Sequence, residues 1–174
     1  MLAGVVLGRN MGDSLEALRE AVREDRAVRR ESRKWSAMSG YFADSPLDGE
    51  DPLIYEVFTW IDGKAETNML ATITVLYPGQ IGGEHFHTKG HYHLNPDGSE
   101  FVVGYWGEGV LETAPREGSI TETPIRPGSH FIVPSGHAHR VVNRSLEPVV
   151  YLSISSAGVG HDYAGVVACG WRIL

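Results

Sequence analysis

The chain has 174 residues, a length typical of one domain or of one domain with an added arm. Its 15 basic and 22 acidic residues give a formal net charge of −7, which argues against nucleic acid as the main partner. One cysteine, Cys169, excludes an internal disulfide, and apolar runs far shorter than about 20 residues argue against a membrane span, so we expect a cytoplasmic protein.

Residues 1–35 are predicted to form an N-terminal helical arm. Leu15, Leu18 and Val22 follow helical spacing, and Asp13 with Glu16 three residues later is typical of a capping box. The arginine-rich end of the arm, residues 23–34, also contains acidic residues, so we interpret it as a solvated helix face rather than a nucleic-acid-binding segment.

Residues 36–174 are predicted to form an all-β domain. Short segments rich in β-branched and aromatic residues alternate with turns that contain glycine and proline, which is typical of a sandwich or barrel. The predicted strands are Leu53–Trp60, Met69–Tyr77, Glu100–Trp106, Val110–Thr113, Ile120–Thr123, His130–Val133, Ala138–Val142 and Val149–Ile154.

Four of the eight histidines fall within the nine residues 85–93. In a strand His91 and His93 would point to the same face, and the turn at residues 95–98 can fold Glu100 back beside them. Two imidazoles and a carboxylate, completed by an imidazole from a distant strand, suit a divalent metal with open positions for substrate. His85 and His87 are interpreted as polar surface residues.

Two motifs in the right order resemble those of the cupin superfamily. The first reads G-H-x-H-x6-E-x6-G from Gly90 to Gly107, and the second reads G-x5-P-x-G-x2-H-x3-N from Gly128 to Asn143. The resemblance adds His139 from the second motif to the ligands. It implies a cupin-type β-barrel, a double-stranded β-helix or jelly roll, with a metal at His91, His93, Glu100 and His139.

The chain resembles one cupin family in particular, the cupin-type glucose-6-phosphate isomerases, over residues 28–171. Matching segments are T-V-L-Y-P-G at 74–79, T-K-G-H-Y-H at 88–93, A-H-R at 138–140 and G-H-D-Y at 160–163. The resemblance implies interconversion of glucose 6-phosphate and fructose 6-phosphate by a homodimer with one divalent metal ion. Fe2+ is the first candidate, and Mn2+, Ni2+ or Zn2+ also suit the ligand set.

Position by position, the resemblance assigns two groups of residues besides the metal ligands. Contacts to the substrate phosphate are implied for Tyr55, Thr74, Thr88 and Gly90. Catalytic roles are implied for Glu100, as the base that moves a proton between C1 and C2, and for His161, as an acid–base group near the sugar. A hydride shift is the alternative to the base, and the side chain of Lys89 can point into the pocket or outward.

The chain departs from the family at several positions. Val102 and Ser155 stand where family members usually have tyrosine, and Pro134-Ser135-Gly136-His137-Ala138-His139 replaces P-P-x-W-A-H. These changes can open space for a different substrate. The alternatives are therefore another metal-dependent cupin, such as another sugar-phosphate isomerase, an iron oxygenase or a decarboxylase, and a non-catalytic ligand-binding cupin.

Overall fold

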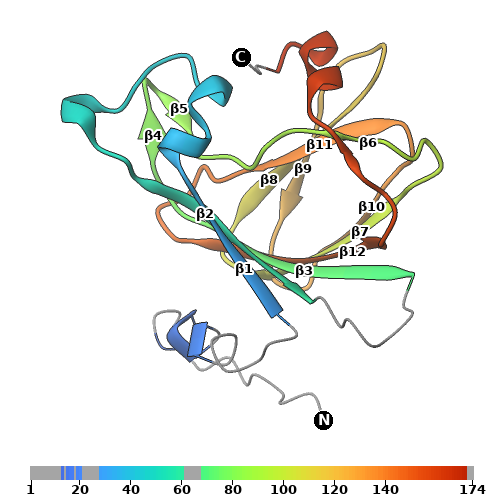
Figure 1. The fold of residues 1–174 in the computed structure, drawn as a ribbon, viewed down its shortest axis with the longest axis horizontal. Coiled ribbons are helices and arrows are strands. Elements are labelled where there is room, and N and C mark those ends of the chain that lie inside the picture. The colour runs from blue at the N-terminus through green and yellow to red at the C-terminus, as the bar shows by residue number, and fades with distance from the viewer. Residues whose placement is uncertain (1–12, 14, 18, 21–27, 61–67, 172–174) are drawn as a thin grey trace.

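The computed structural model describes residues 13, 15–17, 19–20, 28–60 and 68–171, and most of them lie in antiparallel strands and the turns between strands (Figure 1). The strands are β1 (Val28–Lys34), β2 (Leu53–Trp60), β3 (Met69–Leu76), β4 (Gln80–Ile81), β5 (Glu84–His85), β6 (Tyr92–His93), β7 (Glu100–Trp106), β8 (Gly109–Pro115), β9 (Thr121–Ile125), β10 (His130–Val133), β11 (His137–Val142), β12 (Val149–Ser156) and β13 (His161–Asp162). Four 3-10 turns accompany them: η1 (Trp35–Ala37), η2 (Ser39–Tyr41), η3 (Leu47–Gly49) and η4 (Ala164–Cys169).

Two sheets form the body of the fold. A six-stranded sheet has the order β1-β2-β3-β12-β7-β10, and a three-stranded sheet has the order β11-β8-β9. Apolar residues from both sheets, such as Val102 and Leu111, meet in one buried cluster between them. The strand pairs β13-β6 and β4-β5 complete the structure, which is the predicted all-β cupin architecture.

The side-chain alternation of the six-stranded sheet separates an inner face from an outer face. In β7, Glu100 and Val102 are buried while Phe101 between them is exposed. The strand pairing places Ser155 opposite Glu100, and Ser153 opposite Val102. The inner face therefore presents a row of polar and small residues from β3, β12 and β7.

All the strands predicted from residue 53 onward are confirmed, with ends within two residues of the prediction. β2, β7 and β10 have the predicted bounds, and β12 extends two residues further, to Ser156. These segments were recognisable because each packs one apolar side against the core.

The helical interpretation of the arginine-rich stretch is wrong for residues 28–34, which form strand β1 and pair with β2 along its length. Of the predicted helix, Asp13, residues 15–17, Arg19 and Glu20 form a short helical segment, and the other residues of the arm up to 27 lie outside the described part of the chain. The division into an arm and a barrel at residue 35 stays a prediction, although β1 already belongs to the large sheet.

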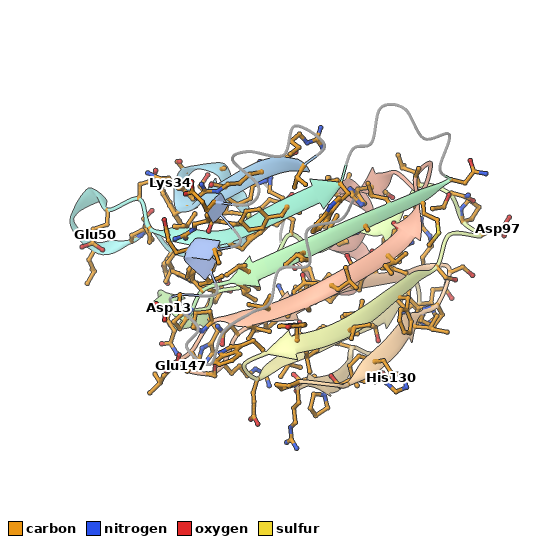
Figure 2. The ribbon with its side chains drawn as sticks, turned by 90° about the horizontal axis from the view of Figure 1, so that it is seen from below. Asp13, Lys34, Glu50, Asp97, His130 and Glu147 are labelled. Carbon is orange, nitrogen blue, oxygen red and sulfur yellow. The ribbon has the colours of Figure 1, made fainter. Side chains whose placement is uncertain are left out.

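The N-terminal helical segment lies against the outer face of the six-stranded sheet, as seen below the sheet in Figure 1. There Leu15 packs on a small cluster formed by Phe58, Val75 and Val150. Figure 2 shows this outer face from below. Among the described residues, none of the helices has both the length and the apolar character that crossing a lipid bilayer requires.

Candidate metal centre and its pocket

Four residues from three parts of the chain bring their ligand atoms together. His93 lies in β6, Glu100 begins β7 and His139 lies in β11, and His91 joins them because it forms a β-bridge with His139. One ligand atom from each of the four lies within 4.8 Å of the others. We call His91, His93, Glu100 and His139 the ligand cluster.

The nitrogen atoms of the histidines show that the cluster fits a metal ion. The Nδ1 atoms of His91 and His93 lie 3.2 and 2.9 Å from the carbonyl oxygens of Lys89 and Gly98, which can only accept, so Nδ1 carries the proton. Their Nε2 atoms, and that of His139, are buried without a hydrogen-bond partner among the described residues. Buried nitrogen lone pairs that converge in this way are what a divalent ion requires of imidazole ligands.

The distances in the cluster agree with this interpretation. Oε2 of Glu100 lies 3.5 Å from Nε2 of His93 and 3.4 Å from Nε2 of His139. Two ligands that are each about 2.1 Å from one ion lie about 3.0 to 3.4 Å apart. The residues present therefore can hold a single metal ion.

The electrostatics favour the ligand forms of Glu100 and His91, whereas burial would lower the pKa of His93 but its hydrogen bonds to Glu100 and Gly98 outweigh burial and raise it. Burial alone would raise the pKa of Glu100, but the neighbouring imidazoles lower it below its ordinary value, so the carboxylate is ionised. Burial, with the nearby His139 and His161, holds the pKa of His91 well below its ordinary value, so this imidazole is neutral. A carboxylate and neutral imidazoles are the states that bind metal.

The cluster opens into a pocket between the two sheets. Its lining residues include His91, Glu100 and His139, the predicted contacts Tyr55, Thr74 and Thr88, and the predicted catalytic residue His161. The ring centroid of His161 lies 4.2 Å from that of His91. The structure thus brings these predicted residues to one cavity.

Gly90 is not among the residues that line this pocket. A Cβ atom at Gly90 would lie 2.5 Å from the ring of Trp171, so the close approach of the two residues requires glycine here. The contact of Gly90 with a phosphate group stays a prediction.

Sequence reasoning missed several residues of the pocket. Tyr151 is buried and hydrogen-bonds the side chains of Thr74 and Thr88, and burial raises its pKa. Thr72 and Ser153 join their hydroxyl groups 2.7 Å apart on the same wall. Alternation along β3 and β12 was the available signal, because Thr72 lies two residues from Thr74 and Ser153 two residues from Ser155.

Two of the departures from the family pattern lie at the same wall. Val102 and Ser155 both line the pocket, and Ser155 is the direct cross-strand neighbour of Glu100. Gly136 has a φ of +72° in the turn before β11, a conformation that favours glycine. It does not line the pocket.

The surface interpretation of His87 is wrong. Its side chain is 4 % exposed, stacks on Phe42 with ring centroids 4.6 Å apart, and donates from Nδ1 to the carbonyl oxygen of Thr88 at 2.9 Å. Burial lowers the pKa of His87 to about 4. His85 instead contacts the side chain of Gln80 near the surface.

The two packed sheets and the ligand cluster between them define a cupin whose site can hold a metal ion. A family model for glucose-6-phosphate isomerase matches residues 46–171. The chain is 39% identical over 143 residues to glucose-6-phosphate isomerase of Thermococcus kodakarensis, covering 80% of this chain and 76% of that protein. It is 41% identical, with the same coverage, to the enzyme of Thermococcus gammatolerans.

The chain belongs to the cupin-type glucose-6-phosphate isomerase family. Among solved structures, oxalate decarboxylase from Bacillus subtilis matches with a TM-score of 0.51 and 19% identity, over 68% of this chain and 28% of that one. This likeness concerns the fold alone. The family relation makes the chain an isomerase, and the chemistry of its site follows from the residues above.

Proposed function

We propose that this pocket interconverts glucose 6-phosphate and fructose 6-phosphate with one divalent metal ion held by the ligand cluster. The observation that supports it most is the convergence of buried, unpartnered imidazole nitrogens on the wall of a hydroxyl-lined pocket, in a chain of this family. We propose Fe2+ as the native ion, with Mn2+, Ni2+ and Zn2+ as alternatives. When bound, the ion would supply a Lewis acid for the sugar oxygens at C1 and C2.

Glu100 is proposed as the base for hydrogen transfer between C1 and C2. Its carboxylate is ionised in the pocket, so it can take the proton from C2 of glucose 6-phosphate and return it to C1. The proton of the C2 hydroxyl passes to the C1 oxygen, and the carboxylate is regenerated. In the competing route, hydrogen moves from C2 to C1 as hydride and no side chain bears it. Solvent deuterium enters the product by the first route and not by the second.

His161 is proposed to assist ring opening. Nδ1 of His161 lies 3.3 Å from the hydroxyl group of Tyr163. If Tyr163 donates to Nδ1, the proton of the neutral ring is on Nε2, from which it can be given to the ring oxygen of the sugar. Burial lowers the pKa of His161, which favours this neutral form.

The hydroxyl groups of Tyr55, Thr74 and Thr88 are proposed to face the substrate phosphate. The backbone N–H of Val141 donates to the Thr88 hydroxyl oxygen at 3.0 Å, which holds this hydroxyl group at the pocket wall. Gly90 is proposed to add a backbone N–H. Charge-assisted hydrogen bonds of this kind position phosphate groups effectively.

A coupled assay with fructose 6-phosphate tests the proposal. The protein is first treated with a chelator and then reloaded separately with Fe2+, Mn2+, Ni2+ or Zn2+. We expect activity to disappear with the chelator and to return with at least one ion. Glu100→Gln should lose turnover while retaining the fold, whereas full turnover in this variant would exclude Glu100 as the base. Inactivity with every ion, on protein that binds one, would contradict the proposed substrate.

We also propose that the protein is a homodimer. Ile132, Phe101, Ile154 and Ala71 are cross-strand neighbours on β10, β7, β12 and β3, and they form an apolar row on the outer face of the large sheet. Ile132 is 68 % exposed and Phe101 is 39 % exposed. A second copy can cover this row symmetrically.

A cytoplasmic location stays a prediction from the composition.

A further inference from the structure

The side chain of Lys89 lines the pocket, which answers the question that the sequence left open. Its ammonium nitrogen lies 5.1 Å from the ring centroid of Tyr41 and 5.8 Å from that of Tyr163. Such contacts with aromatic rings hold a cation in place without neutralising its charge.

Lys89 forms no ion pair within the described residues, although the charge of Glu31 also acts on its ammonium group. Arg33, the nearby cation on β1, is different because its guanidinium group pairs with Glu31. An unpaired, partly buried cation at a pocket is costly unless an anion arrives to compensate it.

The backbone of Lys89 connects the two ends of the pocket. Its carbonyl oxygen accepts the Nδ1 proton of His91 at 3.2 Å, and its backbone hydrogen-bonds the hydroxyl group of Tyr55. Thr88 precedes it in the chain and lines the same pocket. Lys89 therefore borders the hydroxyl-lined end, where Tyr55 and Thr88 carry no charge that could compensate a doubly charged anion.

We propose that the ammonium group of Lys89 binds the phosphate group of the substrate, and that Tyr41 and Tyr163 hold it at the pocket before the substrate arrives. This inference rests on the proposed function for the identity of the substrate, but the chemistry requires only a phosphate dianion. A lysine ammonium group acts as a point charge toward phosphate and does not require the planar geometry of arginine.

The test compares metal-loaded wild type with Lys89→Met, Lys89→Arg and Lys34→Met in steady-state assays with fructose 6-phosphate. Lys34→Met is the matched control, because Lys34 is an exposed lysine paired with Asp51 and its loss changes the net charge equally. We expect Lys89→Met to raise KM by about 10- to 100-fold, as for the loss of a charged hydrogen bond. Its kcat should stay within roughly threefold of wild type, because the bond is made equally in the ground and transition states.

Inhibition by inorganic phosphate distinguishes phosphate binding by Lys89 from a purely structural role, which would leave the phosphate Ki unchanged. Its Ki should rise in Lys89→Met by about the same factor as KM, recover in Lys89→Arg, and stay unchanged in Lys34→Met. Thermal unfolding should show all variants folded. A fall in kcat with KM and the phosphate Ki unchanged would overturn the proposal.

The inference can fail independently of the proposed function. If wild type does not convert fructose 6-phosphate, calorimetric titration of inorganic phosphate into wild type and Lys89→Met still tests the ammonium group. Binding that weakens in Lys89→Met supports the phosphate site while the isomerase proposal fails. Equal binding to both proteins, or no binding to wild type at millimolar phosphate, overturns the role of Lys89.

Discussion

At the scale of single residues, the ring nitrogens separate the histidines of the site from the structural one. His87, His91 and His93 each donate from Nδ1 to a backbone carbonyl oxygen. Nε2 of His91 and of His93 is buried without a partner among the described residues, whereas the ring of His87 stacks on Phe42. The same residue type can therefore belong to a candidate metal site in one place and pack in the core in another. Partners and burial decide the role, and neither is visible in the local sequence.

The buried His87 predicts a pH dependence of stability. Its pKa is about 4 in the folded protein and about 6.5 when unfolded, so the unfolded state binds the extra proton between these values. The contribution of His87 to the free energy of unfolding is complete above about pH 6.5. It falls by up to about 1.4 kcal/mol per pH unit as the pH drops toward 4. His87→Gln should flatten this part of the profile in urea unfolding with chelator present. The exposed His130→Gln is the control, and a His87→Gln profile parallel to wild type would contradict the prediction.

Tyr163 is expected to act through His161. Tyr163→Phe keeps the ring and removes the hydroxyl group that lies 3.3 Å from Nδ1 of His161. Because the hydroxyl orients a group for ring opening, kcat should fall by about 10-fold on cyclic substrate. The rate should fall less when the substrate is supplied mainly in its open-chain form. An equal loss under both conditions would show that Tyr163 does not act in ring opening.

At the scale of elements, a buried carboxylate joins the N-terminal segment and β1 to the sheet. Glu56 on β2 is 0 % exposed and accepts hydrogen bonds from Arg19 at 2.8 Å, from Tyr77 at 2.5 Å and from Arg30. Burial would raise the pKa of Glu56, but these donors lower it below its ordinary value. Its contribution to stability is therefore present above about pH 4.5 and is lost as the pH falls through the lowered pKa.

Glu56→Gln should destabilise the protein by about 1–3 kcal/mol at neutral pH, because Arg19 and Arg30 lose their counter-charge. Hydrogen exchange should increase first at β1 and at the described residues of the N-terminal segment. Glu122→Gln is the control, since its pair with Arg144 is exposed and should matter less. Equal effects of the two substitutions would show that the Glu56 network does not anchor these segments.

The elements also show what the sequence could predict. β2, β7 and β12 were predictable because they are rich in apolar, aromatic and β-branched residues and pack buried side chains on a core. β1 was not, because it is an edge strand whose side chains are mostly polar, and it is held by backbone pairing with β2 and by the ion pair of Arg30 with Glu56. The ligand cluster was predictable from two motifs, whereas Tyr151 and Lys89 required knowledge of which side chains face the pocket.

At the scale of the whole molecule, the outer face of the large sheet predicts the dimer interface. The described N-terminal helical segment lies against one part of that face (Figures 1 and 2). Phe101 and Ile132, at one end of the apolar row, are exposed. Ile132→Glu should leave the fold intact, because Ile132 is largely exposed. It should weaken the dimer at least about 10-fold, because a symmetric interface would bring two buried carboxylates together.

Sedimentation velocity at micromolar concentration measures this effect, with Leu146→Glu as the control. Leu146 is 94 % exposed and lies outside the apolar row, so its substitution changes charge and apolar surface in the same way without touching the proposed interface. A monomeric wild type would contradict the dimer itself. If the dimer is equally stable in Ile132→Glu and Leu146→Glu, the protein is a dimer but its interface lies elsewhere. A carboxylate buried in the apolar row would weaken the dimer.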